Sequence, residues 1–273
     1  MKKLLALVLV VVLALSFTAC GEVKTAEDFV ESVDGALVVA EKGSAGETLA
    51  TGNKFFAKTE YTAVDSMAKA LMDVASGTSD IALVDYVTSI GSIGEGTDYE
   101  DLVVVEGHDF NPEEYGIAFR KGSDITPAVN AAIAELMADG TMDGIAANYK
   151  LQDLLIKDGK AQDDKYEEGD LAYIKEKGKM VIGITYFAPM NYMDDNNKLI
   201  GFETEFAKAV CEKLGVEAEF VEINWNSKEI ELEAKKIDCI WNGMTITDER
   251  LANMSISVPY MNNKQVMVAK KAK

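Results

Sequence analysis

The chain has 273 residues and a formal net charge of −19, with 46 acidic residues against 27 Lys and Arg. So acidic a protein argues against nucleic acid as a partner, because phosphates select Lys and Arg. A single histidine, His108, allows neither a Cys/His zinc site nor a histidine-based catalytic triad. We therefore expect no metal and no cofactor.

Residues 1–20 have the pattern of a secretion signal. Lys2 and Lys3 precede an apolar run over residues 4–15, and small residues lead up to Cys20. A cysteine at this place resembles a bacterial lipobox and predicts lipidation of Cys20, although a weak anchor helix or an ordinary signal with an incidental cysteine remain alternatives. Because this leader holds two lysines and no acid, its removal changes the net charge from −19 to −21.

Short apolar runs alternate with amphipathic stretches over the next part of the chain. Strands are predicted at residues 36–40, 61–64 and 81–84, a Gly/Ser turn at 43–46 opens a helix to about 57, and a second helix follows Asp65. Strand–helix–strand repetition of this kind predicts an α/β unit with a parallel sheet.

A second α/β unit follows an acidic connector at residues 151–169. Before the connector we expect a strand at 115–119, a helix opened by Pro127 and ended by Gly140, and a short helix at 144–150. After it we expect strands at 180–185, 218–222, 238–241 and 265–269, and helices at 203–214 and about 227–236. Cys211 and Cys239 fall in a helix and a strand; they could pair in an exported protein, but two buried free thiols are favoured.

Residues 242–250, NGMTITDER, resemble the ligand-gripping segment of the polar amino-acid binding proteins that serve ABC importers. The passage 171–271, with IDCIWNGMTITDER and SVPY, resembles the opening of that family, and 36–150, with ALVDYVTSI and EEYGIAFRKGS, resembles its continuation. The order of the two passages is inverted. The chain is thus similar to a circularly permuted member of family 3, type II periplasmic binding proteins.

The resemblance implies an α/β fold of two lobes, each a mostly parallel sheet flanked by helices. We expect residues 24–110 to form lobe 2, 111–150 the returning part of lobe 1, 151–169 a linker between the family's usual termini, and 170–273 the main part of lobe 1. The segment His108–Glu114 would be the only covalent bridge between the lobes. Residues 270–273 would lie near 23–28, at the hinge.

Two opposite charges are expected to hold the ligand. The resemblance assigns the ligand carboxylate to Arg250, aided by Thr245 and the backbone of Gly243, since a guanidinium can form two parallel bonds to a carboxylate. It assigns the ligand ammonium to Asp85, at the end of a strand. Without the resemblance, Arg250 would be interpreted as a solvated helix residue and Asp85 as a helix N-cap.

Other predicted ligand contacts surround these charges. Ser44 and Ala45 lie in a turn before a helix, where free amides can receive a carboxylate. Phe187 and Trp225 match the aromatic walls of the family, although as aromatics alone they would be assigned to the core. Glu41 matches residues at the far end of the ligand and would favour a cationic or amide side chain.

The function implied by the resemblance is capture of a polar or charged amino acid between the lobes and its delivery to an ABC transporter permease. We expect a monomeric, non-enzymatic, extracytoplasmic protein, lipid-anchored to the outer face of the bacterial cell membrane, with no nucleic-acid partner. A sensor subunit is one alternative. A dehydratase-like enzyme on the same fold is the other, with Glu41 as its candidate acid or base.

Overall fold

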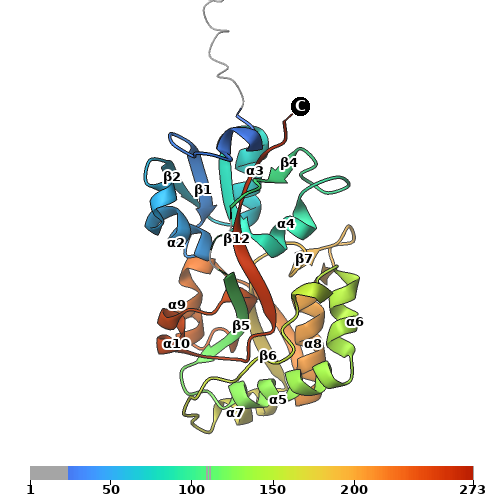
Figure 1. Ribbon diagram of the computed structural model, residues 1–273. Helices are drawn as coiled ribbons and strands as arrows, with labels where there is room; N and C mark the ends of the chain where they lie inside the picture. Colours follow the sequence, from blue (N-terminus) through green and yellow to red (C-terminus); the bar gives the residue numbers. More distant parts are fainter. Residues whose placement is uncertain (1–23, 109, 111, 273) are drawn as a thin grey trace, which may run out of the picture.

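The computed structural model describes residues 24–108, 110 and 112–272. These residues form two α/β lobes stacked one above the other, as predicted (Figure 1). Lobe 2 comprises residues 24–105 and 265–272, and lobe 1 comprises residues 112–264. The predicted signal segment and the lipidation site Cys20 lie outside the described residues.

Lobe 2 is built on two central strands, residues 37–41 and 81–85, that are buried along most of their length. Its elements are η2 (Ala26–Phe29), β1 (Leu37–Glu41), α2 (Ala45–Gly52), η3 (Lys54–Phe56), β2 (Glu60–Val64), α3 (Met67–Ser76), β3 (Ile81–Asp85), α4 (Tyr86–Ser92) and β4 (Leu102–Val104). The N-cap of α3 is Ser66, one residue after the predicted Asp65, because the Ser66 hydroxyl accepts from Lys69 N. Gly77 ends α3 in the left-handed conformation.

Lobe 1 contains the longer helices and most of the aromatic core. Its elements are β5 (Pro112–Arg120), α5 (Ile125–Ala138), α6 (Thr141–Asn148), η4 (Gln152–Leu154), α7 (Asp170–Lys177), β6 (Lys179–Ile184), β7 (Tyr192–Met193), β8 (Leu199–Ile200), α8 (Phe202–Leu214), β9 (Glu217–Glu222), η5 (Trp225–Ser227), α9 (Lys228–Glu233), β10 (Cys239–Thr245), α10 (Asp248–Asn253), β11 (Met254–Ile256) and β12 (Met261–Lys270).

One strand, β12, joins the sheets of the two lobes. The strands follow the order β2-β1-β3-β12-β5-β10-β6-β9, with β11 beside β5 and β4 beside β12. The strands toward the two ends of this order are parallel, β1 with β2 and β3, and β6 with β9 and β10. The first part of β12 pairs antiparallel with β5, from Met261 opposite Tyr115 to Lys264 opposite Pro112. From Gln265 onward the same strand pairs with β3 and then β4.

This crossing strand corrects two predictions from the sequence. Residues 170–273 do not all belong to lobe 1, because residues from Gln265 on complete the sheet of lobe 2. The segment His108–Glu114 is also not the only bridge between the lobes, since β12 is a second one. The apolar run at 265–269 predicted the lobe 2 part of β12, whereas the polar residues Asn262, Asn263 and Lys264 concealed its start.

The two ends of the described chain lie close together at the outer pole of lobe 2 (Figure 1). Lys24 pairs with Asp80 at 3.3 Å, β12 contacts η2, and Lys271 N donates to Asp101 O at 2.8 Å. The predicted proximity is therefore confirmed for the described residues, but its predicted place at the hinge is wrong. Because β12 crosses the hinge before it ends, it carries the end of the chain to the far side of lobe 2.

The connector at 151–169 is attached to lobe 1 along its length. Leu151 is fully buried, Ile156 N donates to Tyr260 O at 3.0 Å, and Asp164 accepts from Lys121 Nζ at 3.1 Å and from the Ser255 hydroxyl. These bonds hold the connector across the segment that leads into β12.

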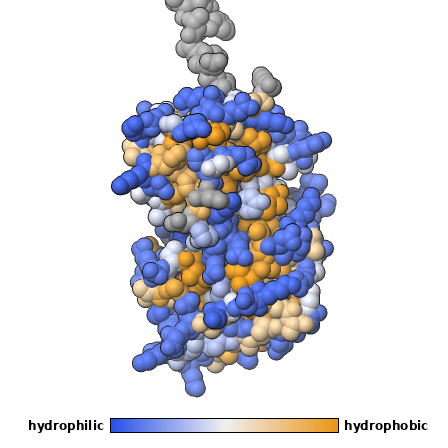
Figure 2. Space-filling model, in the orientation of Figure 1, coloured by the Kyte–Doolittle hydropathy of each residue, from blue (hydrophilic) through white to orange (hydrophobic). Residues whose placement is uncertain are grey.

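Side chains of lobe 1 and lobe 2 pack in continuous apolar cores beneath hydrophilic surfaces. In lobe 1 the Phe206 ring meets the Trp241 ring edge to face, with centroids 5.0 Å apart. Cys211 and Cys239 are buried free thiols, as favoured from the sequence. Figure 2 shows hydrophilic residues over most of the visible face of both lobes. Within the described part of the chain, no helix combines the length and apolar character needed to cross a membrane.

Candidate functional site

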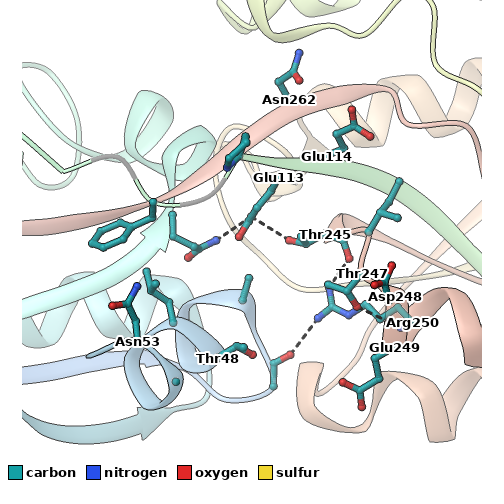
Figure 3. A pocket seen from close by; sticks show the side chains of 18 of the residues that line it. Thr48, Asn53, Glu113, Glu114, Thr245, Thr247, Asp248, Glu249, Arg250 and Asn262 are labelled. Carbon is teal, nitrogen blue, oxygen red and sulfur yellow. Dashed lines mark hydrogen bonds between the residues drawn. The ribbon is translucent and has the colours of Figure 1, made fainter. Parts of the chain in front are cut away.

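A cavity of about 1220 Å³ lies where the two lobes and their crossing segments meet (Figure 3). Lobe 2 lines it with α2 and the turn before it, and lobe 1 with Lys228 and residues 245–250. The crossing segments add Glu113 and Gln265. Ligands of α/β proteins collect in such clefts between domains, at the carboxyl ends of strands.

Arg250 reaches across this cleft from lobe 1. Thr247 caps α10 by accepting from Arg250 N at 3.2 Å, so the guanidinium emerges from the first turn of the helix toward lobe 2. Its Nη1 donates to Thr245 O at 2.6 Å and its Nη2 to Gly43 O at 3.4 Å. Among the described residues no carboxylate forms a salt bridge with it. Burial lowers the pKa of Arg250 from its usual value.

Asp85 lies on the other side of the cleft and is 5% exposed. It occupies the N-cap position of α4, but its carboxylate makes no capping bond. Instead Asp85 Oδ1 accepts from Asn263 Nδ2 at 3.2 Å and from Gln265 Nε2, both on β12. Burial, followed by the nearby Glu113, raises the pKa of Asp85 to about 7.

Glu113 is a site residue that the sequence analysis missed. Its Oε2 accepts from Asn263 Nδ2 at 2.8 Å and from Gln265 Nε2 at 3.1 Å. It also accepts from the Thr245 hydroxyl at 3.1 Å (Figure 3). The bond to Thr245 joins this carboxylate to the segment that carries Arg250. Two features of the sequence could have indicated it as a site residue. These are the two adjacent acids at the start of β5 and the polar residues at the start of β12.

Gly243 supports the site from below. Its N–H donates to Glu203 Oε1 at 2.8 Å, so it is not directed to a ligand as predicted. The Tyr260 hydroxyl donates to the same oxygen, and Asn191 Nδ2 to Glu203 Oε2 at 2.9 Å. With φ at +55° and a substituent Cβ only 2.9 Å from Phe187 Cζ, position 243 favours glycine. Phe187, 4% exposed, therefore packs beneath the segment that carries Arg250.

The turn before α2 uses its polar groups internally. The Ser44 hydroxyl caps α2 by accepting from Glu47 N at 3.2 Å, and Gly43 N donates to Glu47 Oε2 at 2.7 Å. Ala45 lines the cavity, whereas the Ser44 side chain is used as a cap. The group of this turn that bonds to lobe 1 is the carbonyl oxygen of Gly43.

Lys228 is a second cation that the sequence analysis missed. Its Nζ donates to Gly43 O at 3.2 Å and to Trp225 O at 3.3 Å, and lies 4.6 Å from the centroid of the Trp225 ring. Trp225, 5% exposed, is therefore covered by Lys228 and packs into the core of lobe 1. Burial and then the charge of Arg250 lower the pKa of Lys228 to about 8.

Glu41 is buried behind these cations and is only 1% exposed. Burial, then the charge of Asp85, raises its pKa to about 8, and the charge of Lys228 opposes this shift. Its Oε1 has no hydrogen-bond partner among the described residues. Of the predicted ligand contacts, Arg250, Thr245 and Ala45 line the cavity, while Asp85 adjoins it through Gln265. In this closed arrangement Glu41, Phe187 and Trp225 lie behind the wall.

Comparisons with known proteins match the last third of the chain. Residues 180–273 match the family model of bacterial extracellular solute-binding proteins, family 3. The L-cystine-binding protein TcyJ of Escherichia coli K12 is 38% identical over 95 residues, which are 34% of this chain and 36% of that protein. The ABC transporter arginine-binding protein 1 of the same organism is 34% identical over 96 residues, 35% of this chain and 39% of that protein.

The matches are partial, and this chain spans less than half the length of these relatives. Among solved structures, a mutant of ArgBP from T. maritima is 35% identical, with 31% of this chain and 37% of that chain covered and a TM-score of 0.30. The matched residues, 180–273, run from β6 through the Arg250 segment to the end of β12. Over these residues the chain is similar to family 3 of the bacterial extracellular solute-binding proteins.

Proposed function

We propose that this protein captures a polar or charged amino acid in the cleft between its lobes and delivers it to an ABC importer. The observation that carries the proposal is the position of Arg250. A guanidinium at the wall of a cavity, bonded only to backbone carbonyls among the described residues, is ready to bind a ligand carboxylate. Asp85 and Glu113 place more negative than positive groups on this side of the cavity, and these carboxylates can bind the ligand ammonium.

The charges around the cavity favour a cationic or polar side chain on the ligand. The lining contains more carboxylates than cations: Glu113, Glu114, Glu229, Asp248 and Glu249 against Lys228 and Arg250. Once Arg250 is neutralised by the ligand carboxylate, the rest of the wall is acidic, and a second positive charge on the ligand gains from it. The names of the relatives, which include cystine-binding and arginine-binding proteins, support this class of ligand.

The inverted order of the two passages leads us to propose a circular permutation of the family fold. The proximity of Lys24 to Asp80 and of Lys271 to Asp101 supports it, since a permuted chain begins and ends where two neighbouring elements were once connected. In this proposal the connector 151–169 closes the family's usual ends. The leader pattern supports export and lipid anchoring at Cys20 on the outer face of the cell membrane.

Binding without chemistry is the proposed role. A dehydratase-like reaction requires an acid or base facing the substrate, and Glu41, the candidate named from the sequence, lies behind the cavity wall. A sensor subunit would use the same clamp, and the proposal of import over sensing depends on the relatives named as ABC transporter proteins.

Thermal unfolding of the lipid-free Cys20→Ser protein tests the proposal against the twenty amino acids, cystine and small organic acids. We expect one polar or cationic amino acid to raise the melting temperature, because a ligand that binds only the folded state stabilises it. In Arg250→Ala the affinity should fall by about 2–5 kcal/mol, since the loss leaves a buried carboxylate without its partner. Lys236→Ala, on a surface pair with Glu231, is the matched control and should keep the full shift. A folded protein that responds to no amino acid would overturn the proposal.

A further inference from the structure

Asp85 and Glu113 form a carboxylate pair at the hinge. They come from different elements, the end of β3 and the start of β5, yet the same two side-chain amides, Asn263 and Gln265, donate to both. Each amide stands on β12, the strand that crosses between the lobes. The pair is therefore held in place by the hinge strand itself, and Glu113 faces the cavity.

The immediate surroundings of this pair contain more negative than positive groups. The donors to it are neutral, namely Asn263, Gln265 and the Thr245 hydroxyl. The titratable and charged groups that interact with the pair from the elements packed around it are Glu41 on β1, Tyr115 on β5, Glu203 on α8, Tyr260 before β12, and Arg250 on α10. Arg250 is the cation among them, and its own bonds go to two carbonyl groups. Asp85 is buried whereas Glu113 is half-buried, and a buried carboxylate beside a second carboxylate ionises less readily than one in water.

We infer that Asp85, held beside Glu113 by the amides of β12, carries a proton in the cleft without ligand and releases it to the solvent when the ammonium group of a ligand binds beside the two carboxylates. This inference rests on the proposed function and adds a proton to its binding equilibrium. One positive charge replaces another: the ammonium enters with its own protons, the Asp85 proton leaves to water or buffer, and no bond within the ligand is made or broken.

The raised pKa of Asp85, about 7, supports this exchange. Asp85 then carries its proton below neutral pH and loses it above. A ligand ammonium has to compete with that proton only on the acidic side. Affinity should therefore weaken by roughly tenfold for each pH unit below the pKa and level off above it.

Titration calorimetry in two buffers of different ionisation enthalpy measures the released proton directly. The probe is L-arginine, or whichever of the twenty amino acids raises the melting temperature most. At pH 6 we expect release of nearly one proton per ligand bound, and at pH 8 nearly none. Binding without proton release at pH 6 would overturn the inference and leave the proposed function intact. If no amino acid binds the folded protein, the proposed function fails and the inference fails with it.

Two single-charge variants locate the proton. In Glu113→Gln we expect the release at pH 6 to fall below the wild-type value, because Asp85 keeps its burial but no longer faces a second carboxylate. Glu212→Gln removes the same charge from an exposed position on α8 that does not line the cavity, and it should keep the release. Equal loss in both variants, or full release in Glu113→Gln, would show that the pair is not its source. The proton release measured with the wild-type protein tests the inference even if neither variant folds.

Discussion

The sequence contains two arginines, and both lie in lobe 1 with opposite kinds of partner. Arg120, 7% exposed, bonds through Nε to Asp170 Oδ2 at 3.0 Å, and its Nη2 lies 3.8 Å from Asp238 Oδ1. Its Nη1 donates to the carbonyls of Leu232 and Ile237. Arg250 has carbonyl acceptors and no carboxylate among the described residues.

This difference separates a structural cation from a cation available for binding. Arg120 joins β5 to α7 and to the start of β10, and its charge is compensated within the lobe. The charge of Arg250 has only dipoles to balance it, one of which, at Gly43, belongs to the other lobe. Because a carboxylate binds a guanidinium more strongly than a carbonyl does, a ligand can displace the carbonyls from Arg250.

The largest effect that this comparison predicts is on folding. Arg120→Ala should lower the free energy of unfolding by about 3–5 kcal/mol, because it leaves the buried Asp238 without one of its two cations. Chemical denaturation followed by circular dichroism measures the change. Arg250→Ala is the matched variant and should lower the stability by far less while it weakens ligand binding. If both variants lost equal stability, Arg250 would also be a structural residue.

The two arginines also show how far the sequence could predict this molecule. The segment 242–250 indicated Arg250 and Thr245 as ligand-binding residues, because its resemblance covers a continuous stretch; both line the cavity, and their contact with a ligand stays a prediction. The two α/β units were also predicted correctly, since alternating strands and helices are a local pattern. The partners of Arg120 come from residues 170, 232, 237 and 238, and no local pattern indicates such a set.

The less predictable parts of the site depend on contacts between distant segments. Glu113 becomes a site residue only because β12 brings Asn263 and Gln265 beside it, about 150 residues later in the chain. Trp225 and Phe187 have the residue types of ligand walls, but Lys228 and Gly243 cover them in this closed arrangement. The residue type alone does not predict which other residue of the protein packs against an aromatic ring.

A smaller effect concerns the carboxylate beneath the Arg250 segment. Burial raises the pKa of Glu203 to about 7 against a usual value of 4.5, so the folded state holds its proton more tightly than the unfolded state does. The stability from this group is therefore fully present below pH 4.5 and is lost as the pH rises toward 7. Over that range the free energy of unfolding should fall by about 1.4 kcal/mol for each pH unit.

Glu203→Gln tests this dependence. The wild-type free energy of unfolding should fall between pH 5 and pH 8, and the variant should show a smaller fall, because a glutamine does not titrate. Glu212→Gln, an exposed change on the same helix α8, should keep the wild-type profile. A variant of Glu203 with the wild-type profile would assign the pH dependence to the other buried acids, Glu41 and Asp85.

The smallest effect concerns Lys228, which shares the Gly43 carbonyl with Arg250. Lys228→Met keeps an apolar chain over the Trp225 ring but loses the bond between the lobes, worth about 1 kcal/mol. We expect a smaller closed fraction in small-angle scattering and roughly fivefold weaker ligand binding, mostly through faster dissociation. Lys236→Met, away from the cleft, should change neither quantity. Weaker binding with an unchanged closed fraction would mean that Lys228 contacts the ligand itself, and that lobe 1 presents two cations to it instead of one.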